Sequence, residues 1–320
     1  MKKLRFAALA AVGAIALAAC SGTGQSDGPA DSSDLDLTYA VITHGAPGDA
    51  FWDRVKSGAE RAGEDYGVDV EYSSDPDPSK QSALIDGAVA DKVDGIVVSM
   101  ANPDGLKSSV EAAVAAGVPV VTINSGIEFS KAFGAITHVG QSEDIAGQAV
   151  GERLKSEGFK KVLCVVQEAG NVALETRCKA TAETMGGTVE NLQVDGTDDN
   201  AVQATITSKL QSDKSIDGVL TLGGQYAIDA VAAVEESGSS ARVATFDLSE
   251  DVIKDIQSDK IVFAVDQQPF VQGYEGVSVL YLKSINGNDV GGGQPINSGP
   301  AFITKDNADA VLKFAEEGTR

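Results

Sequence analysis

Short runs of apolar and β-branched residues alternate with longer helical stretches along most of this chain. Strands that are buried on both faces read as continuous apolar runs, and alternation with helices implies parallel strands joined by right-handed crossovers. The pattern therefore predicts an α/β fold built from doubly wound parallel sheets. The predicted strands are Tyr39–Thr43, Val68–Tyr72, Ile96–Met100, Val118–Ile123, Ala135–Val139, Lys161–Gln167, Thr188–Val194, Val219–Leu222, Val243–Phe246 and Ile261–Val265.

The alternation contains an internal repeat. A shift of 123 positions places Asp94-Gly95-Ile96-Val97 on Asp217-Gly218-Val219-Leu220, and Val120–Asn124 on Val243–Asp247. The same shift places Tyr39–Thr43 on Val162–Val166. One offset held across three strands predicts two similarly built domains in tandem. The alternative is one large sheet, although single cores seldom grow beyond about 250–300 residues.

Polar residues follow the predicted strands in both halves of the repeat. Ligands of open parallel sheets bind beyond the carboxyl ends of the strands. We therefore expect the polar residues of the two domains to face each other across a cleft. The candidates are His44–Trp52, Asn102 and Asn124 in the first domain, and Glu168–Asn171, Gln225 and Asp247 in the second.

The segment Asp49-Ala50-Phe51-Trp52 has two adjacent aromatic residues, one of them the only tryptophan. A flat apolar face surrounded by hydrogen-bonding groups suits a neutral polyhydroxy ligand, which stacks one face on the aromatic ring. The alternative is that both aromatics only pack the helix against the core. Arg177 lies on the helix after the equivalent strand, where it would offer several donors to hydroxyl groups. Its alternative is a surface ion pair with Glu175 or another neighbour.

Charge and motifs exclude several classes of function. The formal net charge of −22 argues against a nucleic-acid partner, since such binding needs lysine and arginine to neutralise phosphates. The only histidines, His44 and His138, have no cysteine or second histidine at metal-ligand spacing. The sequence has no Gly-x-Ser-x-Gly elbow and no P-loop. We therefore expect no catalytic residues, no metal and no cofactor.

The N-terminus has the pattern of an export signal. Lys2, Lys3 and Arg5 precede an apolar stretch that is too short to span a membrane, and Leu17-Ala18-Ala19-Cys20 follows. This ending resembles the bacterial lipobox, which predicts a signal peptide over 1–20 and a lipid on Cys20; the alternative is an ordinary signal with a chance cysteine. Residues 21–36 are rich in Ser, Gly and Asp, as in a flexible tether. After residue 20 no apolar run reaches the roughly 18 residues of a spanning helix. We expect an extracytoplasmic protein that is anchored to the cell membrane only through the lipid.

Two further cysteines, Cys164 and Cys178, remain in the exported part of the chain. An even pair outside the cytoplasm can be oxidised. The hypothesis is a disulfide between them, and the alternative is two buried small hydrophobic residues.

Several of these motifs, in this order, resemble the ribose and simple-sugar group of type I periplasmic binding proteins, the receptors of ABC importers. The resemblance covers residues 38 to 315. It implies a protein without enzymatic activity that has two lobes joined by a three-segment hinge, and a small neutral sugar or polyol as ligand. It also implies an ABC permease in the membrane as partner, and we expect a monomer. The motifs are the lipobox and tether, Phe51-Trp52, Asp94-Gly95-Ile96, Pro119–Asn124, Phe246-Asp247, and Gln267 followed by Pro269.

The resemblance implies a set of ligand contacts. By position, Phe51 and Trp52 match the stacking pair and Asp49 the polar residue before it. Asn124 stands where the family has an aspartate of the first lobe. Further polar contacts from the second lobe and the hinge match Arg177, Asp247 and Gln267.

The sequence also departs from the family pattern. Asn124-Ser125 replaces Asp-Arg, Gly223 replaces an asparagine, and Thr197 stands where an aromatic would close the stack. A different pentose, a hexose, a polyol or another small polar molecule is therefore as good a candidate as ribose.

The resemblance implies binding by hinge closure, in which ligand favours the closed form. We expect the chain to cross between lobes near 126–134, 264–268 and 290–298. The N-terminal lobe is then 38–130 plus 267–292, and the C-terminal lobe is 131–266 plus 293–316. Two alternatives are a sensory module that feeds a receptor kinase or chemoreceptor, and an extracellular enzyme on the same fold.

Overall fold

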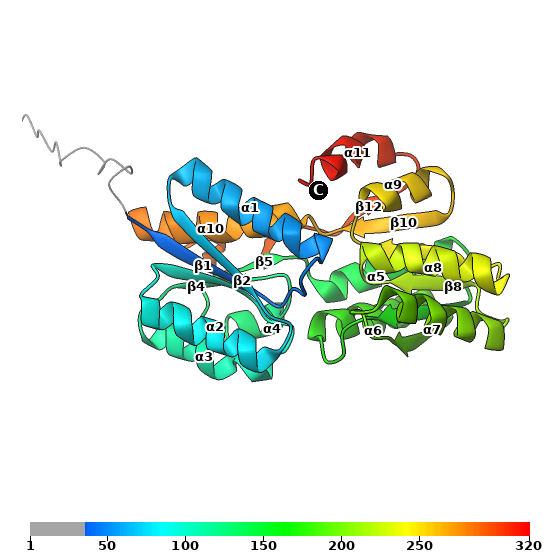
Figure 1. Ribbon diagram of the computed structural model, residues 1–320, viewed down its shortest axis with the longest axis horizontal. Helices are drawn as coiled ribbons and strands as arrows, with labels where there is room; N and C mark the ends of the chain where they lie inside the picture. The colour runs from blue at the N-terminus through cyan, green and yellow to red at the C-terminus, as the bar shows by residue number, and fades with distance from the viewer. Residues whose placement is uncertain (1–35) are drawn as a thin grey trace, which may run out of the picture.

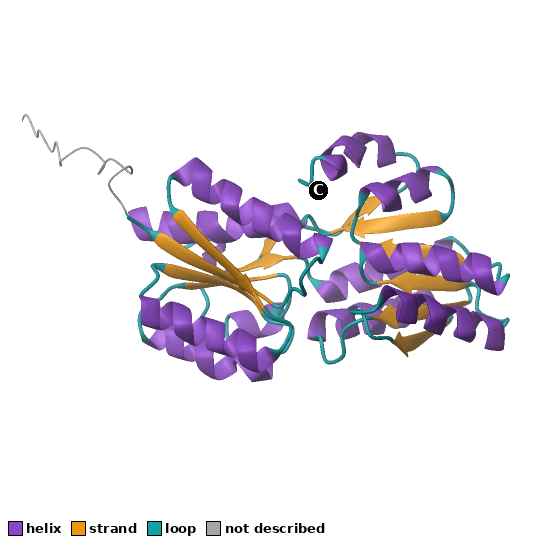
Figure 2. Ribbon diagram, in the orientation of Figure 1, coloured by secondary structure: helices purple, strands orange, loops and turns teal. Residues whose placement is uncertain are grey.

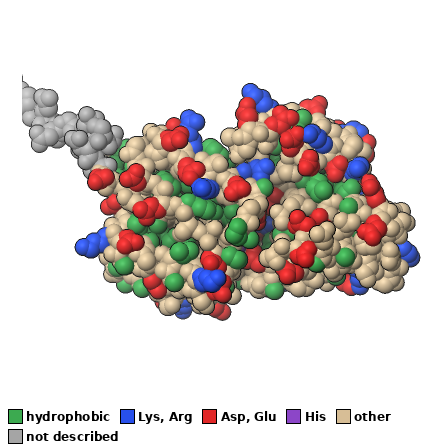
Figure 3. Space-filling view, in the orientation of Figure 1, with side chains coloured by type: hydrophobic (Ala, Val, Ile, Leu, Met, Phe, Trp, Pro, Cys, Tyr) green, Lys and Arg blue, Asp and Glu red, His purple; other side chains and the backbone are tan. Residues whose placement is uncertain are grey.

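The computed structural model describes residues 36–320, which form two α/β lobes (Figures 1 and 2). The lobes lie side by side, as the space-filling view also shows (Figure 3). Each lobe has one six-stranded sheet, and helices cover both faces of it. The predicted signal peptide, Cys20 and all but the last residue of the predicted tether lie outside the described residues. Within the described part of the chain, no helix is both long enough and apolar enough to cross a bilayer.

The first lobe is built on the strand order β11-β5-β4-β3-β1-β2, in which every pair is parallel. Helices α1 and α10 pack together against one face of this sheet, and α2 and α3 against the other. The strands are β1 (Thr38–Thr43), β2 (Asp69–Ser74), β3 (Gly95–Ser99), β4 (Val120–Ile123), β5 (His138–Gly140) and β11 (Ile296–Asn297). The helices are α1 (Ala50–Tyr66), α2 (Pro78–Asp91), α3 (Pro103–Ala115), α4 (Ile127–Ser130), α10 (Pro269–Asn286) and the 3-10 helix η2 (Val290–Gly293).

The second lobe is built on the strand order β12-β10-β9-β8-β6-β7, in which only β12 is antiparallel to its neighbour. Helices α5 and α6 cover one face, while α7, α8 and α9 cover the other. The strands are β6 (Lys161–Val166), β7 (Thr188–Gln193), β8 (Gly218–Thr221), β9 (Arg242–Phe246), β10 (Ile261–Asp266) and β12 (Ala301–Ile303). The helices are α5 (Glu143–Ser156), α6 (Val172–Met185), α7 (Asp199–Ser212), α8 (Gly224–Ser237), α9 (Glu250–Gln257) and α11 (Ala308–Glu316).

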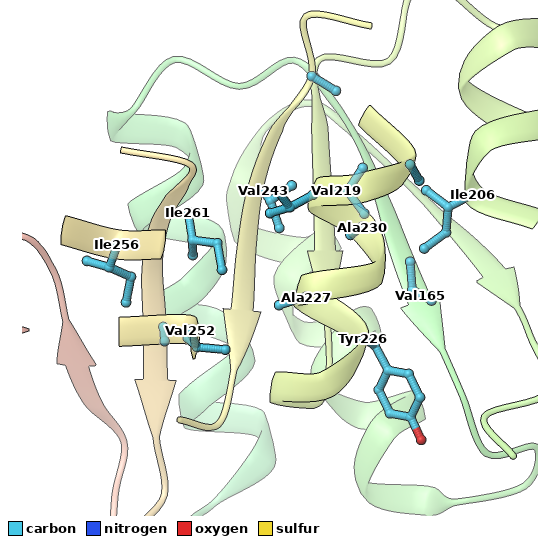
Figure 4. Close-up of a cluster of buried hydrophobic side chains, with 14 of the residues drawn as sticks. Val165, Ile206, Val219, Tyr226, Ala227, Ala230, Val243, Val252, Ile256 and Ile261 are labelled. Carbon is cyan, nitrogen blue, oxygen red and sulfur yellow. The ribbon is translucent and has the colours of Figure 1, made fainter. Parts of the chain in front are cut away.

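Apolar side chains form a continuous core beneath the helices of each lobe. In Figure 4, Ile206 from α7 lies near Val165 of β6, Ala230 from α8 near Val219 of β8, and Ile256 from α9 near Ile261 of β10. These side chains are almost fully buried. The strands that the sequence predicts as unbroken apolar runs are thus covered on both faces, which confirms the predicted fold class.

The internal repeat corresponds to equivalent strands of the two lobes. The offset of 123 relates β1 to β6, β3 to β8 and β4 to β9, as the sequence predicts. It also relates the start of β5, at His138, to the start of β10, at Ile261. The last strand before each of the first two crossings therefore occupies the same place in both lobes.

Two of the predicted lobe boundaries need correction. β5 lies in the first sheet, because Thr122 and Ile123 of β4 pair with His138 and Val139. The first crossing therefore follows Gly140 rather than falling near 126–134. β11 also lies in the first sheet, beside β5, so this part of 293–316 does not belong to the second lobe. The other crossings are at 266–269, between β10 and α10, and at 297–301, between β11 and β12.

The second lobe contains a disulfide between Cys164 and Cys178. Cys164 lies in β6 and Cys178 in α6, so the bond ties this helix to a central strand. Of the two alternatives that the sequence leaves open, the structure contains the bridge.

Candidate functional site

A cavity of about 440 Å³ lies between the two lobes. Residues after β1 and β4 of the first lobe line it, together with residues after β6, β8 and β9 of the second. This is where the carboxyl ends of the strands meet, the usual place for a ligand in α/β sheets. Its volume is within the range of small-molecule sites.

The first lobe contributes an aromatic wall. Asp49 caps α1 by accepting a hydrogen bond from the Phe51 amide at 2.9 Å, which starts the helix so that Phe51 and Trp52 reach the cavity. The rings of His44 and Phe51 meet the Trp52 ring edge to face, at centroid distances of 4.5 and 5.0 Å. His44 Nδ1 lies 2.7 Å from Ser99 Oγ, and burial lowers the pKa of His44. The wall is therefore rigid and uncharged at neutral pH.

Three side chains form a polar floor at the hinge end of the cavity. Asn124 and Asp247 follow β4 and β9 and have φ values of 60° and 67°, a left-handed backbone that Asn and Asp tolerate better than most residues. Gln267 connects them: its Oε1 accepts a hydrogen bond from Asn124 Nδ2 at 3.2 Å, and its Nε2 donates to Asp247 Oδ1 at 2.7 Å. Since Gln267 directly follows β10, the hydrogen-bond network lies at the second crossing.

Arg177 enters the cavity from α6 and is almost completely buried. Its Nε and Nη2 donate to the two carboxylate oxygens of Glu143 at 2.5 and 2.8 Å. Its Nη1 donates to the Leu222 carbonyl at 3.3 Å, and its guanidinium lies 4.7 Å from the centre of the Phe246 ring. The alternative of a surface ion pair with Glu175 is wrong, because Glu175 is exposed and Arg177 pairs with Glu143 inside the protein.

Burial changes the acidity of several carboxyl groups in the cavity. It raises the pKa of Asp247 to about 7, against the opposing effects of Arg177 and the Gln267 hydrogen bond. It also raises the pKa of Asp49, and that of Asp229 to about 6 with a contribution from Asp199. At neutral pH the floor therefore offers both a donor and an acceptor form of Asp247.

The structure brings ten of the eleven predicted ligand-binding residues to the cavity. Asn102 is the exception: its side chain caps α3 by accepting a hydrogen bond from the Gly105 amide at 2.9 Å, and it does not line the cavity. The ten predicted residues that line the cavity are His44, Asp49, Phe51, Trp52, Asn124, Asn171, Arg177, Gln225, Asp247 and Gln267.

Sequence analysis missed Tyr226, the aromatic residue that the second lobe contributes. Its hydroxyl donates to the Gly196 carbonyl at 3.1 Å, and its ring lies close to Gly223, where a Cβ would be 3.0 Å from the ring. The available signal was its position beside Gln225, in the first turn of α8. Two buried acceptors of the lining, Gln167 Oε1 and Asp229 Oδ2, have no hydrogen-bond partner among the described residues.

The two lobes touch each other at the edge of the cavity. The Val172 amide, at the start of α6, donates to the Ala101 carbonyl after β3 at 3.1 Å. His44 Nε2 lies 3.9 Å from Glu168 Oε2. These contacts describe a closed arrangement of the lobes. Among residues 36–320, no cluster of His, Cys, Asp or Glu has the arrangement of a metal site.

The sequence and the fold of this chain are both similar to those of known proteins. Residues 39–288 match the family described as periplasmic binding protein domain. A carbohydrate transporter from Acidothermus cellulolyticus 11B, solved in complex with myo-inositol, is 48% identical, with a TM-score of 0.88; the match covers 89% of this chain and all of that one.

Curated relatives are more distant but match over most of their length. The xylitol-binding protein of Mycolicibacterium smegmatis is 24% identical, over 97% of this chain and 88% of its own. The ribose import binding protein of Bacillus subtilis is also 24% identical, over 76% and 79%. The chain belongs to the periplasmic binding protein family, whose members are binding proteins of transporters rather than enzymes.

Proposed function

We propose that this chain is the extracytoplasmic binding protein of an ABC importer and that it captures an uncharged sugar or cyclic polyol between its lobes. A lipid on Cys20 holds it at the outer face of the cell membrane, close to the permease that receives the ligand. The contact residues are those predicted from the sequence, without Asn102 and with Tyr226 added.

One observation carries this proposal: an aromatic wall from one lobe and a hydrogen-bonding floor that joins both lobes line the same cavity. A polyhydroxy ring has an apolar C–H face and a rim of hydroxyl groups, so it needs both surfaces at once. The relatives named for myo-inositol, xylitol and ribose are all named for polyhydroxy compounds.

The polar groups match hydroxyls in both directions. Asn124 and Gln267 each have a donor and an acceptor, while Asp247 accepts when ionised and donates when protonated. The unpartnered acceptors Gln167 Oε1 and Asp229 Oδ2 suit further hydroxyl donors. A ligand that satisfies these groups removes the cost of burying them without partners.

Ligand stabilises the closed form to the extent that it binds that form better than the open one. Each lobe alone offers only half of the contacts, so closure around the ring is favourable when the ring is present. The closed form would then dock on the permease. The lipid anchor raises the local concentration of the binding protein near that permease.

Isothermal titration with a panel of neutral sugars and polyols tests the proposal, with myo-inositol, xylitol and ribose in the first set. We expect at least one to bind with a one-to-one stoichiometry and to change the fluorescence of Trp52. L-Leucine, which lacks hydroxyls, is the control ligand. A folded protein that binds none of the panel would contradict the proposal.

The anchor is tested separately. Mass spectrometry of the membrane fraction should find lipid on Cys20, and Cys20→Ser should release the protein from the membrane. An unmodified Cys20 in an exported protein would overturn the anchor while leaving the ligand-binding proposal in place.

A further inference from the structure

Glu143 lies directly behind the cavity and does not line it. It is the first residue of α5, only 3% exposed, and both of its carboxylate oxygens are taken by Arg177. Gln141 Nε2 also donates to Glu143 Oε2, at 2.9 Å. A carboxylate at the N-terminus of a helix is further stabilised by the backbone dipole. These contacts therefore hold the Glu143 carboxylate in one fixed position against the Arg177 guanidinium.

This pairing determines what Arg177 offers to a ligand. Among the described residues, Arg54 and Arg177 are the only Lys or Arg side chains that line the cavity. Buried guanidinium groups are strong binding sites for carboxylates and phosphates when they are unpaired. Here Nε and Nη2 of Arg177, which could otherwise donate to an anionic ligand, donate to Glu143. Carboxyl groups are the more common charged lining: Asp49, Glu168, Asp199, Asp229, Asp247 and Asp251.

We propose that Glu143 is a specificity-determining residue: by cancelling the charge of Arg177 from behind, it makes the cleft accept uncharged polyhydroxy solutes and reject their carboxylated and phosphorylated analogues. This inference rests on the proposed function. It assigns to Arg177 the role of a hydrogen-bond donor without a free charge, and to Glu143 a positioning role that acts through Arg177.

The physical reason is the cost of burying an unpaired charge. An anionic ligand loses hydration on entering the cavity and regains little from Arg177, the buried cation of the lining, because Glu143 already pairs with it. A neutral ligand has no such cost and needs only the remaining hydrogen bonds. The pair therefore discriminates between ligands of the same shape that differ in charge.

The test compares two matched pairs of probes: myo-inositol with myo-inositol 1-phosphate, and D-ribose with D-ribose 5-phosphate. Titration of the wild-type protein should give an affinity for the neutral member at least about a hundredfold higher than for its phosphate. Glu143→Gln keeps the shape of the side chain and removes its charge. We expect the ratio of anion affinity to neutral affinity to rise about tenfold or more in this variant.

Controls separate this role from a structural one. Glu152→Gln removes the same charge from an exposed position of the same helix, and the ratio should remain as in the wild type. If Glu143→Gln does not fold, Glu143→Asp replaces it. The shorter carboxylate keeps its charge but loses the two-point contact, so the ratio should rise by about threefold.

The outcomes are distinguishable. Wild-type protein that binds a neutral probe and its phosphate equally well overturns the inference and leaves the proposed function in place. The same holds if the ratio is unchanged in the folded Glu143 variant. Wild-type protein that binds only the phosphates contradicts both, and folded protein that binds none of the four probes and no member of the sugar and polyol panel contradicts the proposed function on which the inference rests.

Discussion

The two lobes have the same fold but contribute opposite chemistry to the cavity. The first lobe provides the aromatic wall, and the second provides the buried ion pair and most of the carboxyl groups. The offset of 123 shows how this difference arose at equivalent positions. Asn124 of the first lobe corresponds to Asp247 of the second, in the same left-handed backbone conformation.

Two arginines make the comparison sharper. Arg54 and Arg177 are equivalent by the same offset, and both line the cavity. Arg54 is half-buried and donates to two backbone carbonyls, those of Ala50 and Arg320. Arg177 is buried and paired with Glu143. The same residue type thus joins α1 to the C-terminal residue through a backbone carbonyl in one case, and forms a buried charge pair in the other.

The helices that carry these arginines are also held differently. Cys164 and Cys178 correspond to Val41 and Val55, two fully buried residues of one hydrophobic cluster in the first lobe. Apolar packing holds α1, whereas a covalent bond beside Arg177 holds α6. Directional hydrogen bonds lose strength with small displacements, while stacking tolerates them. The disulfide therefore lies in the lobe whose contacts with the cavity are mostly directional hydrogen bonds.

The largest expected effect separates the two arginines. Arg177→Met leaves the Glu143 carboxylate buried without its partner, so we expect the free energy of unfolding to fall by about 3–5 kcal/mol. Arg54→Met loses hydrogen bonds to carbonyls that water can reach, at a cost of about 1 kcal/mol or less. Urea denaturation of both variants measures the difference. Equal losses would show that the lobes use these arginines in the same way.

The second prediction converts the covalent contact of the second lobe into the apolar contact of the first. Cys164→Val with Cys178→Val removes a bridge between residues 14 positions apart, which should cost about 2–3 kcal/mol of stability. Reductant should lower the urea midpoint of the wild type and leave that of the double variant unchanged. A wild-type midpoint that is insensitive to reductant would count against a stabilising bridge.

The third prediction concerns the aromatic wall. Trp52→Leu removes the stacking face, and the affinity for the ligand identified by titration should fall about tenfold. Glu175→Ala changes the equivalent, exposed position of the second lobe and should leave the affinity unchanged. Circular dichroism of both variants checks that they fold. Comparable losses from the two variants would mean that the wall is not confined to the first lobe.

The last prediction distinguishes Asp247 from Asn124 by the pH dependence of the free energy of unfolding, which over one pH unit is a smaller effect than the first two. Burial raises the pKa of Asp247 to about 7 in the folded protein, whereas in the unfolded chain the carboxyl has its ordinary pKa of 3.8. Its contribution to stability is therefore full below pH 3.8 and is lost as the pH rises towards 7, by about 1.4 kcal/mol per pH unit at most. Asp247→Asn should flatten this part of the stability curve of the ligand-free protein. Parallel curves for both proteins would contradict the raised pKa.

Much of the fold follows from local patterns. Strand periodicity and the repeat predict both sheets and place polar residues at strand ends, which is why most predicted residues reach the cavity. The prediction for Asn102 is wrong because a polar residue at a strand end can also cap the next helix. The geometry of the turn determines which of the two roles the side chain takes. The first crossing was placed too early because the pairing of the three-residue β5 depends on the edge of β4 rather than on its own sequence.

Contacts between distant elements could not be predicted. Glu143 is 34 positions from Arg177, and its sequence context shows only an acidic residue at a helix start. The pair exists because α5 and α6 pack side by side on one face of the sheet. Tyr226 is missed for a related reason: which residues in the first turn of α8 reach the cavity depends on the rotation of that helix.

The hydrogen bond between the Val172 amide and the Ala101 carbonyl has an evolutionary consequence. Because main-chain atoms make it, most amino-acid replacements at either position preserve it. Side chains around the cavity can therefore be substituted without removing this contact between the lobes. The choice of ligand and the meeting of the two lobes thereby depend on different atoms.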